Sequence, residues 1–309
     1  MISLAALLRE RGKLAEAEAL NRRALAGHEA HLGANHPGTL TSMNILALLL
    51  RQQGKLAEAE ELQRKALAGR ETQLGADHPE TLTSISHLAV VLQQKGKLDE
   101  AEELQRTALA GRETQLGADH PKTLESISHL AVVLEEQGKL DEAEELQRKA
   151  LAGRETQLGA DHPETLQSIS HLAVVLEKLG KLDEAEGLYR RALEGQESQL
   201  GPQHPDTLVS VNNLAMLLER QGKLEEAEEL HRRVLTGRED QLGPVHPDTL
   251  TSVWNLAHLL EDKGSVTEAG QLYLRELRGL EELHGPEHEK TRGRRRNLER
   301  FQRQHGPID

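Results

Sequence analysis

The chain contains no cysteine, and its 309 residues include only four aromatic side chains: Tyr189, Trp254, Tyr273 and Phe301. Because neither disulfides nor stacked rings can hold such a chain together, we predict a core of Leu, Ala, Val and Ile. No apolar run approaches the roughly 20 residues that span a bilayer. The opening segment MISLAALLRERG lacks the charged start and cleavage site of a secretory signal. We therefore expect a soluble, cytoplasmic protein with no membrane partner.

Basic residues are outnumbered by acidic ones. Lysine and arginine number 38 against 51 aspartates and glutamates, which gives a formal net charge of −13. A general nucleic-acid binder needs a basic surface to displace counterions from phosphates. We therefore predict no nucleic-acid partner and interpret the acidic excess mainly as a source of solubility.

What the sequence does contain is a period of 42 residues. A glycine recurs at Gly12, Gly54, Gly96, Gly138, Gly180, Gly222 and Gly264, and the surrounding sequence recurs with it. A period of this length indicates a solenoid, in which each repeat completes its core with its neighbours. We predict one array over residues 1–309, with a truncated first repeat (1–31), six full repeats (32–285) and a C-terminal capping helix (286–309).

Each repeat predicts two helices. Either Asp77 or His78 can cap a helix that starts at Pro79, and apolar residues then recur at spacings of three and four until Gly96, where a left-handed turn is expected. The first helix is thus predicted over about residues 79–95. A second helix follows until Leu116, and the short turn requires the two helices to pack antiparallel, with small Ala89, Ala101 and Ala108 between them.

Glycines also occur inside the predicted second helix, at Gly69, Gly111 and Gly153. Glycine costs about 1 kcal/mol relative to alanine in a helix, so another contact must offset it. A close approach of the next repeat's first helix is the preferred explanation, and a local kink is the alternative.

The pattern resembles the tetratricopeptide repeat, and Leu88, Ala89, Gly96, Ala101 and Ala108 carry the resemblance. The 42-residue unit with its LG-x-x-HP linker is similar to the kinesin light chain subgroup and to the repeats of NACHT and NB-ARC receptors. The resemblance implies an all-α, right-handed superhelical solenoid that acts as a non-catalytic interaction scaffold. It also implies that an asparagine facing the groove bonds the backbone of a bound peptide, a role that Asn44 and Asn212 would carry, whereas Ser86, Ser128, Ser170 and Trp254 occupy that position elsewhere.

The repeats that begin at Leu74 and Leu116 differ at six positions, and none of these lies in the predicted core. Several of them form a second stripe beside the core stripe of the first helix. Either exposed positions drift freely, or the stripe is tuned to a ligand. In tetratricopeptide arrays this stripe lines the concave groove, and its residues here are Asn44, Leu48, Thr83, Ser86, Val90, Gln93, Glu125, Ser128, Val132, Glu135, Glu136, Ser170, Val174, Glu177, Asn212, Met216, Glu219, Trp254, His258 and Glu261.

This stripe combines carboxylates with a row of aliphatic side chains. Such a groove suits an extended or helical peptide in which Lys or Arg lies beside aliphatic residues. Trp254 has two interpretations, because it could be a binding hot spot or could lie beneath the C-terminal helix. The basic run Arg294 to Arg296 could likewise touch an anionic partner or form a solvated face.

Most of the sixteen histidines follow the 42-residue period. Equivalent residues in neighbouring repeats should lie roughly 10 Å apart, whereas zinc requires ligands about 2 Å from one centre. We therefore predict no metal site and no cofactor. The sequence contains no phosphate loop, HExxH or GxSxG motif, so we also predict no enzymatic activity.

Two other functions remain open. The chain could be the sensor arm of a larger NACHT or NB-ARC signalling ATPase, or a purely structural or consensus-engineered array without a ligand. The truncated first repeat could also expose an apolar face, which would favour end-to-end self-association.

Overall fold

A computed structural model describes residues 5, 7, 8 and 12–308. These residues form helices and no strands. The helices are α2 (Leu14–Leu32), α3 (Pro37–Gln52), α4 (Leu56–Leu74), α5 (Pro79–Gln94), α6 (Leu98–Leu116), α7 (Pro121–Glu136), α8 (Leu140–Leu158), α9 (Pro163–Lys178), α10 (Leu182–Leu200), α11 (Pro205–Arg220), α12 (Leu224–Leu242), α13 (Pro247–Asp262), α14 (Val266–His284) and α15 (Glu289–His305). The predicted all-α class is confirmed. Most of the truncated helix predicted before Gly12 lies outside the described residues.

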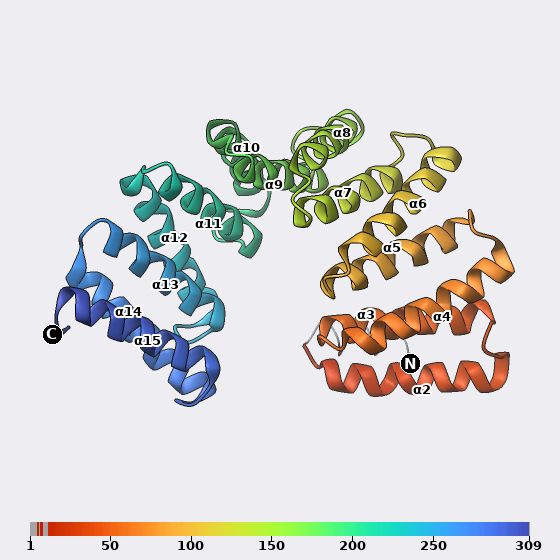
Figure 1. The fold of residues 1–309 in the computed structure, drawn as a ribbon, viewed down its shortest axis with the longest axis horizontal. Coiled ribbons are helices and arrows are strands. Elements are labelled where there is room, and N and C mark those ends of the chain that lie inside the picture. The colour runs from red at the N-terminus through yellow and green to blue at the C-terminus, as the bar shows by residue number, and fades with distance from the viewer. Residues whose placement is uncertain (1–4, 6, 9–11, 309) are drawn as a thin grey trace. The chain divides into compact units, whose positions relative to one another are not determined.

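The chain divides into two compact units, Met1–Gln157 (unit 1) and Leu158–Asp309 (unit 2). Unit 1 holds α2 to α8 except for the last residue of α8, and unit 2 holds α9 to α15. From α2 to α7 each helix packs on the next, and the same is true from α9 to α15 (Figure 1). Hereafter the helix that starts each repeat is called helix A, and its partner is called helix B.

Each full repeat begins with the same capped turn. The Nδ1 atom of His78 accepts a hydrogen bond from the backbone N–H of Glu80 at 3.2 Å, and Pro79 occupies the first turn of α5. The histidine, and not Asp77, is therefore the cap. At the other end of α5, Gly96 has φ +73°, as predicted, and a second left-handed glycine, Gly117 at φ +89°, ends α6.

The core of a repeat is aliphatic, as the composition predicts. In unit 1, Leu88, Ala89 and Leu92 of α5 pack against Ala101 and Ala108 of α6 in one buried cluster. All three alanines are 0% exposed. Burying each large aliphatic side chain contributes roughly 1.5–3 kcal/mol, and the alanines allow the helix axes to approach closely.

The glycines inside helix B mark a close contact, but the partner differs from the predicted one. A Cβ atom added to Gly111 would lie 2.7 Å from Cδ2 of Leu82. Leu82 belongs to helix A of the same repeat, not to that of the next repeat. The equivalent leucine stands at the same place in the other full repeats, for example Leu40 against Gly69 and Leu166 against Gly195. The absent side chain thus makes room for the first turn of the adjacent helix A.

Ion pairs connect successive helices B within each unit. In unit 1, Arg106 of α6 bonds Glu102 in its own helix at 2.9 Å and Glu142 of α8 at 2.6 Å. Lys139 reaches Glu102 at 2.7 Å. Lys139 and Arg106 together lower the pKa of Glu102 to about 2. Because this carboxylate is mostly shielded from water, the network stabilises the contact between repeats more than isolated surface pairs would.

The C-terminal helix α15 packs on α14. It buries Leu298 and Phe301, and the Phe301 ring meets the Tyr273 ring edge-on at 5.3 Å. Two of its arginines form ion pairs with α14. Arg294 bonds the buried Glu276 at 2.9 Å, and Arg295 bonds Glu281 at 2.7 Å. Two residues of the basic run therefore hold the helix in place.

Candidate functional site

The predicted groove residues lie on the helices A, which are α3, α5 and α7 in unit 1 and α9, α11 and α13 in unit 2. Most of these side chains are half-buried or exposed, as a binding surface requires. Asn44, Ser86 and Ser128 are the exceptions, because each is less than 10% exposed.

The side chains of these three buried residues already form hydrogen bonds with other groups of the chain. In the amide orientation that satisfies its neighbours, Asn44 donates to Oε1 of Gln63 at 2.7 Å and accepts from Arg70. Ser86 donates to the carbonyl of Leu82 at 3.2 Å, and Ser128 accepts from Arg154 at 2.8 Å. A peptide backbone would have to compete with these partners.

Unit 1 contains a cleft of about 280 Å³ between α3, α5, the end of α4 and the start of α7, with walls of mixed charge. Leu48 and Thr83, which belong to the predicted stripe, line it together with Arg70, Glu80 and Lys122. Arg70 is buried and donates to Ser84, and burial lowers its pKa. Two cations and one carboxylate therefore face this cleft, which differs from the acidic groove predicted from the sequence.

Unit 2 contains a larger cleft, of about 510 Å³, between α9, α10 and α11. Ser170 and Val174 belong to the predicted stripe and line this cleft. Its formally charged side chains are Glu164 and Asp206, and His171 is the only other titratable residue on its wall. Both formally charged residues among the described lining residues are therefore acidic.

Apolar surface accompanies this charge on α11. Val209 lines the cleft and is 48% exposed, and Met216 is 47% exposed. The sequence prediction included Met216 but missed Val209 and Asp206. Val209 stands thirteen residues before its turn glycine, as Thr83 and Glu125 do in their repeats. The period alone could therefore have identified it.

The predicted carboxylates of unit 2 are held by neighbouring side chains. Glu177 accepts from the Tyr189 hydroxyl at 3.3 Å and pairs with Arg220. Glu261 accepts from the Tyr273 hydroxyl at 2.7 Å. Burial and this carboxylate raise the pKa of Tyr273, so the phenol stays protonated and donates. In unit 1, Glu136 accepts from Gln93 at 2.9 Å. The remaining predicted residues Val90, Val132, Glu125 and Glu135 lie on α5 and α7.

Trp254 is partly buried in the C-terminal cluster. The Arg294 guanidinium carbon of α15 lies 3.7 Å from the centre of its ring, and the Tyr273 ring is 5.1 Å away. Of the two interpretations of Trp254, the structure favours packing beneath the C-terminal helix. On the neighbouring helix α11, Asn212 is half-buried, and its Oδ1 accepts from Asn255 at 3.0 Å.

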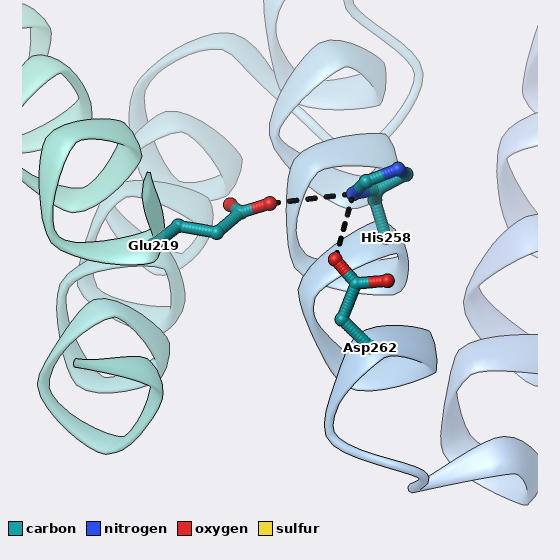
Figure 2. A group of neighbouring side chains, drawn as sticks. All are labelled: Glu219, His258 and Asp262. Carbon is teal, nitrogen blue, oxygen red and sulfur yellow. Dashed lines mark hydrogen bonds and ion pairs between the residues drawn. The ribbon is translucent and has the colours of Figure 1, made fainter. Parts of the chain in front are cut away.

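Two carboxylates and an imidazole meet where α11 lies beside α13 (Figure 2). The Nδ1 atom of His258 is 3.3 Å from Oε1 of Glu219 and 3.7 Å from Oδ2 of Asp262. Behind them, Nε2 of the buried His231 lies 3.6 Å from the other oxygen of Glu219. His231 and His258 both lower the pKa of Glu219. The 42-residue period relates only equivalent histidines, so it does not predict this cluster.

No helix in the described part of the chain is long and apolar enough to cross a membrane. The family model for the tetratricopeptide repeat matches residues 1–72, 46–114, 80–156, 123–198, 164–240 and 208–264. A search of curated protein sequences found no match.

The chain is also similar to repeat proteins of known structure. A protein of Podosopora anserina, described as of the kinesin light chain type with nearly identical TPR-like repeats, is 31% identical with a TM-score of 0.60 over 66% of this chain and 97% of that chain. BtubC (BKLC) from P. vanneervenii is 26% identical, with a TM-score of 0.60 over 76% of this chain and 92% of that chain. A tetratricopeptide repeat protein from Parabacteroides merdae shares the fold at 17% identity, with a TM-score of 0.63 over 96% and 97% of the two chains.

Proposed function

Because this chain belongs to the tetratricopeptide repeat family, in its kinesin light chain-like form, we propose that its helices A bind a peptide in which Lys or Arg lies beside aliphatic residues. The repeats imply a protein–protein interaction scaffold, and proteins of this family are generally non-catalytic. The specific proposal concerns the ligand and its position. We assign the main contact to the cleft of unit 2.

The charge of that cleft is the observation that carries the proposal. Both formally charged residues on its wall, Glu164 and Asp206, are acidic. A peptide ammonium or guanidinium group would find a complementary potential there, which favours encounter and register. In the unit 1 cleft, Arg70 and Lys122 would repel the same group.

Exposed aliphatic surface supplies the second requirement. Val174 and Val209 line the cleft, and Met216 lies two turns further along α11. Covering such side chains yields about 25 cal/mol per Å² of apolar area removed from water. Met216 is unbranched and adaptable, so it can pack against aliphatic side chains of different shape. Asn212, on the same helix, could bond the peptide backbone if it exchanged its bond to Asn255.

A peptide-display selection on the full chain tests the proposal, with a chelator present so that metal ions play no part. The informative variant is Glu164→Lys combined with Asp206→Lys. The chain already tolerates lysine at the position of Glu164, because Lys122 is its equivalent in α7. Glu80→Lys, which makes the Glu164→Lys substitution at the equivalent position of unit 1, is the control, and circular dichroism verifies that each variant is helical.

We expect the parent and Glu80→Lys to enrich basic and aliphatic peptides, and the double variant to bind the enriched peptides at least ~10-fold more weakly, since two favourable charges become repulsive. Failure of the parent to enrich any basic motif would contradict the proposal. Equal enrichment on all three proteins would place binding outside the unit 2 cleft.

A further inference from the structure

The geometry points to a divalent transition-metal site formed by Glu219, His258 and Asp262, with zinc as the best-fitting ion. Histidine, cysteine, aspartate and glutamate are the side chains that commonly bind such ions. Among the described residues, these three form the one group of at least three such side chains whose ligand atoms all lie within 4.8 Å of one another. The inference does not depend on the proposed peptide function.

The ligand atoms converge from two helices. Glu219 stands near the end of α11, and His258 and Asp262 stand one turn apart on α13, so that their side chains share a face (Figure 2). Two ligands of a tetrahedral zinc ion lie about 3.3 Å apart, given bonds of about 2.0 Å. The separations of 3.3 and 3.7 Å from Nδ1 of His258 to the two carboxylates are close to this value. Small side-chain rotations would place an ion between them.

The cluster departs from the repeat pattern. His258 occupies a position that is aliphatic in the other full repeats: Leu48, Val90, Val132, Val174 and Met216. Asp262 occupies a position that holds Lys178 and Arg220 in the two preceding repeats. An imidazole and an aspartate therefore coincide at these two positions in this repeat and in no other full repeat.

A buried histidine supports the carboxylate from behind. His231 is 1% exposed, and its Nε2 has no hydrogen-bond partner among the described residues, while Oε2 of Glu219 lies 3.6 Å away. Burying a polar nitrogen without a partner is unfavourable. A metal ion bound to Oε1 would fix the orientation of the Glu219 carboxylate, so that Oε2 could accept a hydrogen bond from Nε2 of His231. Such supporting bonds typically orient metal ligands.

The local charge also favours a dication. Glu219 and Asp262 bring two negative charges, and the nearest cations along the chain are committed elsewhere, because Arg220 pairs with Glu177 and Lys263 with Glu228. One imidazole with two carboxylates suits zinc, cobalt, nickel or copper better than magnesium or calcium, which prefer all-oxygen sites. The exposed face of His258 leaves room for water to complete the coordination.

Isothermal titration of Zn²⁺ into the full chain tests the site, and the single tryptophan gives a second signal. The Trp254 ring lies 6.2 Å from the His258 ring, so bound Cu²⁺ should quench its fluorescence, with reversal by EDTA. We expect one zinc per chain. His258→Val, which restores the residue found in the equivalent position of α9, should weaken binding by more than ~100-fold, beyond the loss typical of a supporting residue.

Two further variants separate a ligand role from a folding defect. Asp262→Asn keeps the size of the side chain and should also weaken binding strongly. His231→Gln, as at Gln147, should cost roughly 10-fold in affinity, whereas His231→Tyr, as at Tyr189, keeps a donor and should cost less. His31→Asn removes an exposed histidine at the end of α2 and is the control. The absence of zinc binding, or equal affinity in His258→Val and His31→Asn, would overturn the site and leave His258 as an ion-pair partner of the two carboxylates.

Discussion

The two units differ most clearly at one buried position of helix B. The full repeats of unit 1 carry glutamine there, at Gln63, Gln105 and Gln147, whereas unit 2 carries Tyr189, His231 and Tyr273. Gln105 is fully buried, and neither atom of its amide has a hydrogen-bond partner among the described residues. The hydroxyls of Tyr189 and Tyr273 instead reach Glu177 and Glu261 on the adjacent helices A.

This difference shows that the same repeat architecture can carry different buried polar side chains in its two units. The histidine caps, the turn glycines and the alanines equivalent to Ala89 and Ala101 are the same in both units, whereas the position of Ala108 holds Val234 and Glu276 in the last two repeats of unit 2. In unit 2, however, the longer side chains of helix B extend to the carboxylates of helix A and hold them at the surface. Unit 1 keeps its polar groups inward and has a cleft of mixed charge. We therefore expect unit 1 to contribute mainly to stability and unit 2 mainly to recognition.

The largest expected effect that separates the units is the pH dependence of their stability. Burial raises the pKa of Glu276 in unit 2 to about 7, despite Arg294. The folded state thus holds this proton more tightly than the unfolded state, whose pKa is near 4.5. The associated stability is fully present below pH 4.5 and is lost as the pH rises through 7, by up to ~3 kcal/mol.

The stability of unit 1 should change with pH in the opposite direction. The pKa of Glu102 is lowered to about 2, so its contribution is present above pH 4.5 and is lost as the pH falls toward 2. Hydrogen exchange, corrected for intrinsic rates, can follow α14 and α15 separately from α6. Glu276→Gln should remove the pH dependence of stability between pH 5 and 8 in α14 and α15. The same pH dependence of stability in both units would contradict these roles of Glu276 and Glu102.

The buried glutamines of unit 1 give the next largest effect. Gln105→Met has a similar volume and removes an amide without partners, so unit 1 should become more stable by ~1–2 kcal/mol. Chemical denaturation of the parent and the variant measures the change. A loss of stability of the same size would mean that the amide is satisfied, for example by a buried water.

Removing a hydroxyl from unit 2 should have the smallest effect. Tyr189→Phe deletes the bond to Glu177 but keeps the ring, so we expect unit 2 to lose ~1 kcal/mol. Hydrogen exchange at α9 and α10 gives the readout. Gln147→Leu at the equivalent position in unit 1 is the comparison, and it should not reduce stability. A loss of stability in both variants would show that the two units do not differ in the role of this buried position.

The repeat architecture was predictable because each of its signals is local. His78-Pro79 and Gly96 act through their own backbone, and the alanines act through helical spacing. The contact of Gly111 was only half predictable. Its close approach followed from helix propensity, but the identity of Leu82 as the partner depends on where the two helices cross.

The candidate site was less predictable, because it depends on register between repeats. The period placed Glu219 and His258 on one stripe, but at different distances from their turn glycines, so that their approach follows from the way α11 lies on α13. Asn44 fits the family pattern, yet its amide is used by Gln63 and Arg70, which lie on α4. Sequence spacing within one helix carries no information about such partners.

Photo-crosslinking with a peptide enriched by display, carrying a photoreactive group beside its lysine, tests most directly whether unit 2 is the recognition surface. Mass spectrometry of the crosslinked full chain would locate the attachment. We predict labelling on α9 and α11, around Val174, Val209 and Met216, and its loss in the Glu164→Lys and Asp206→Lys variant. Labelling confined to α3, α5 and α7, or to the helices B, would contradict the account.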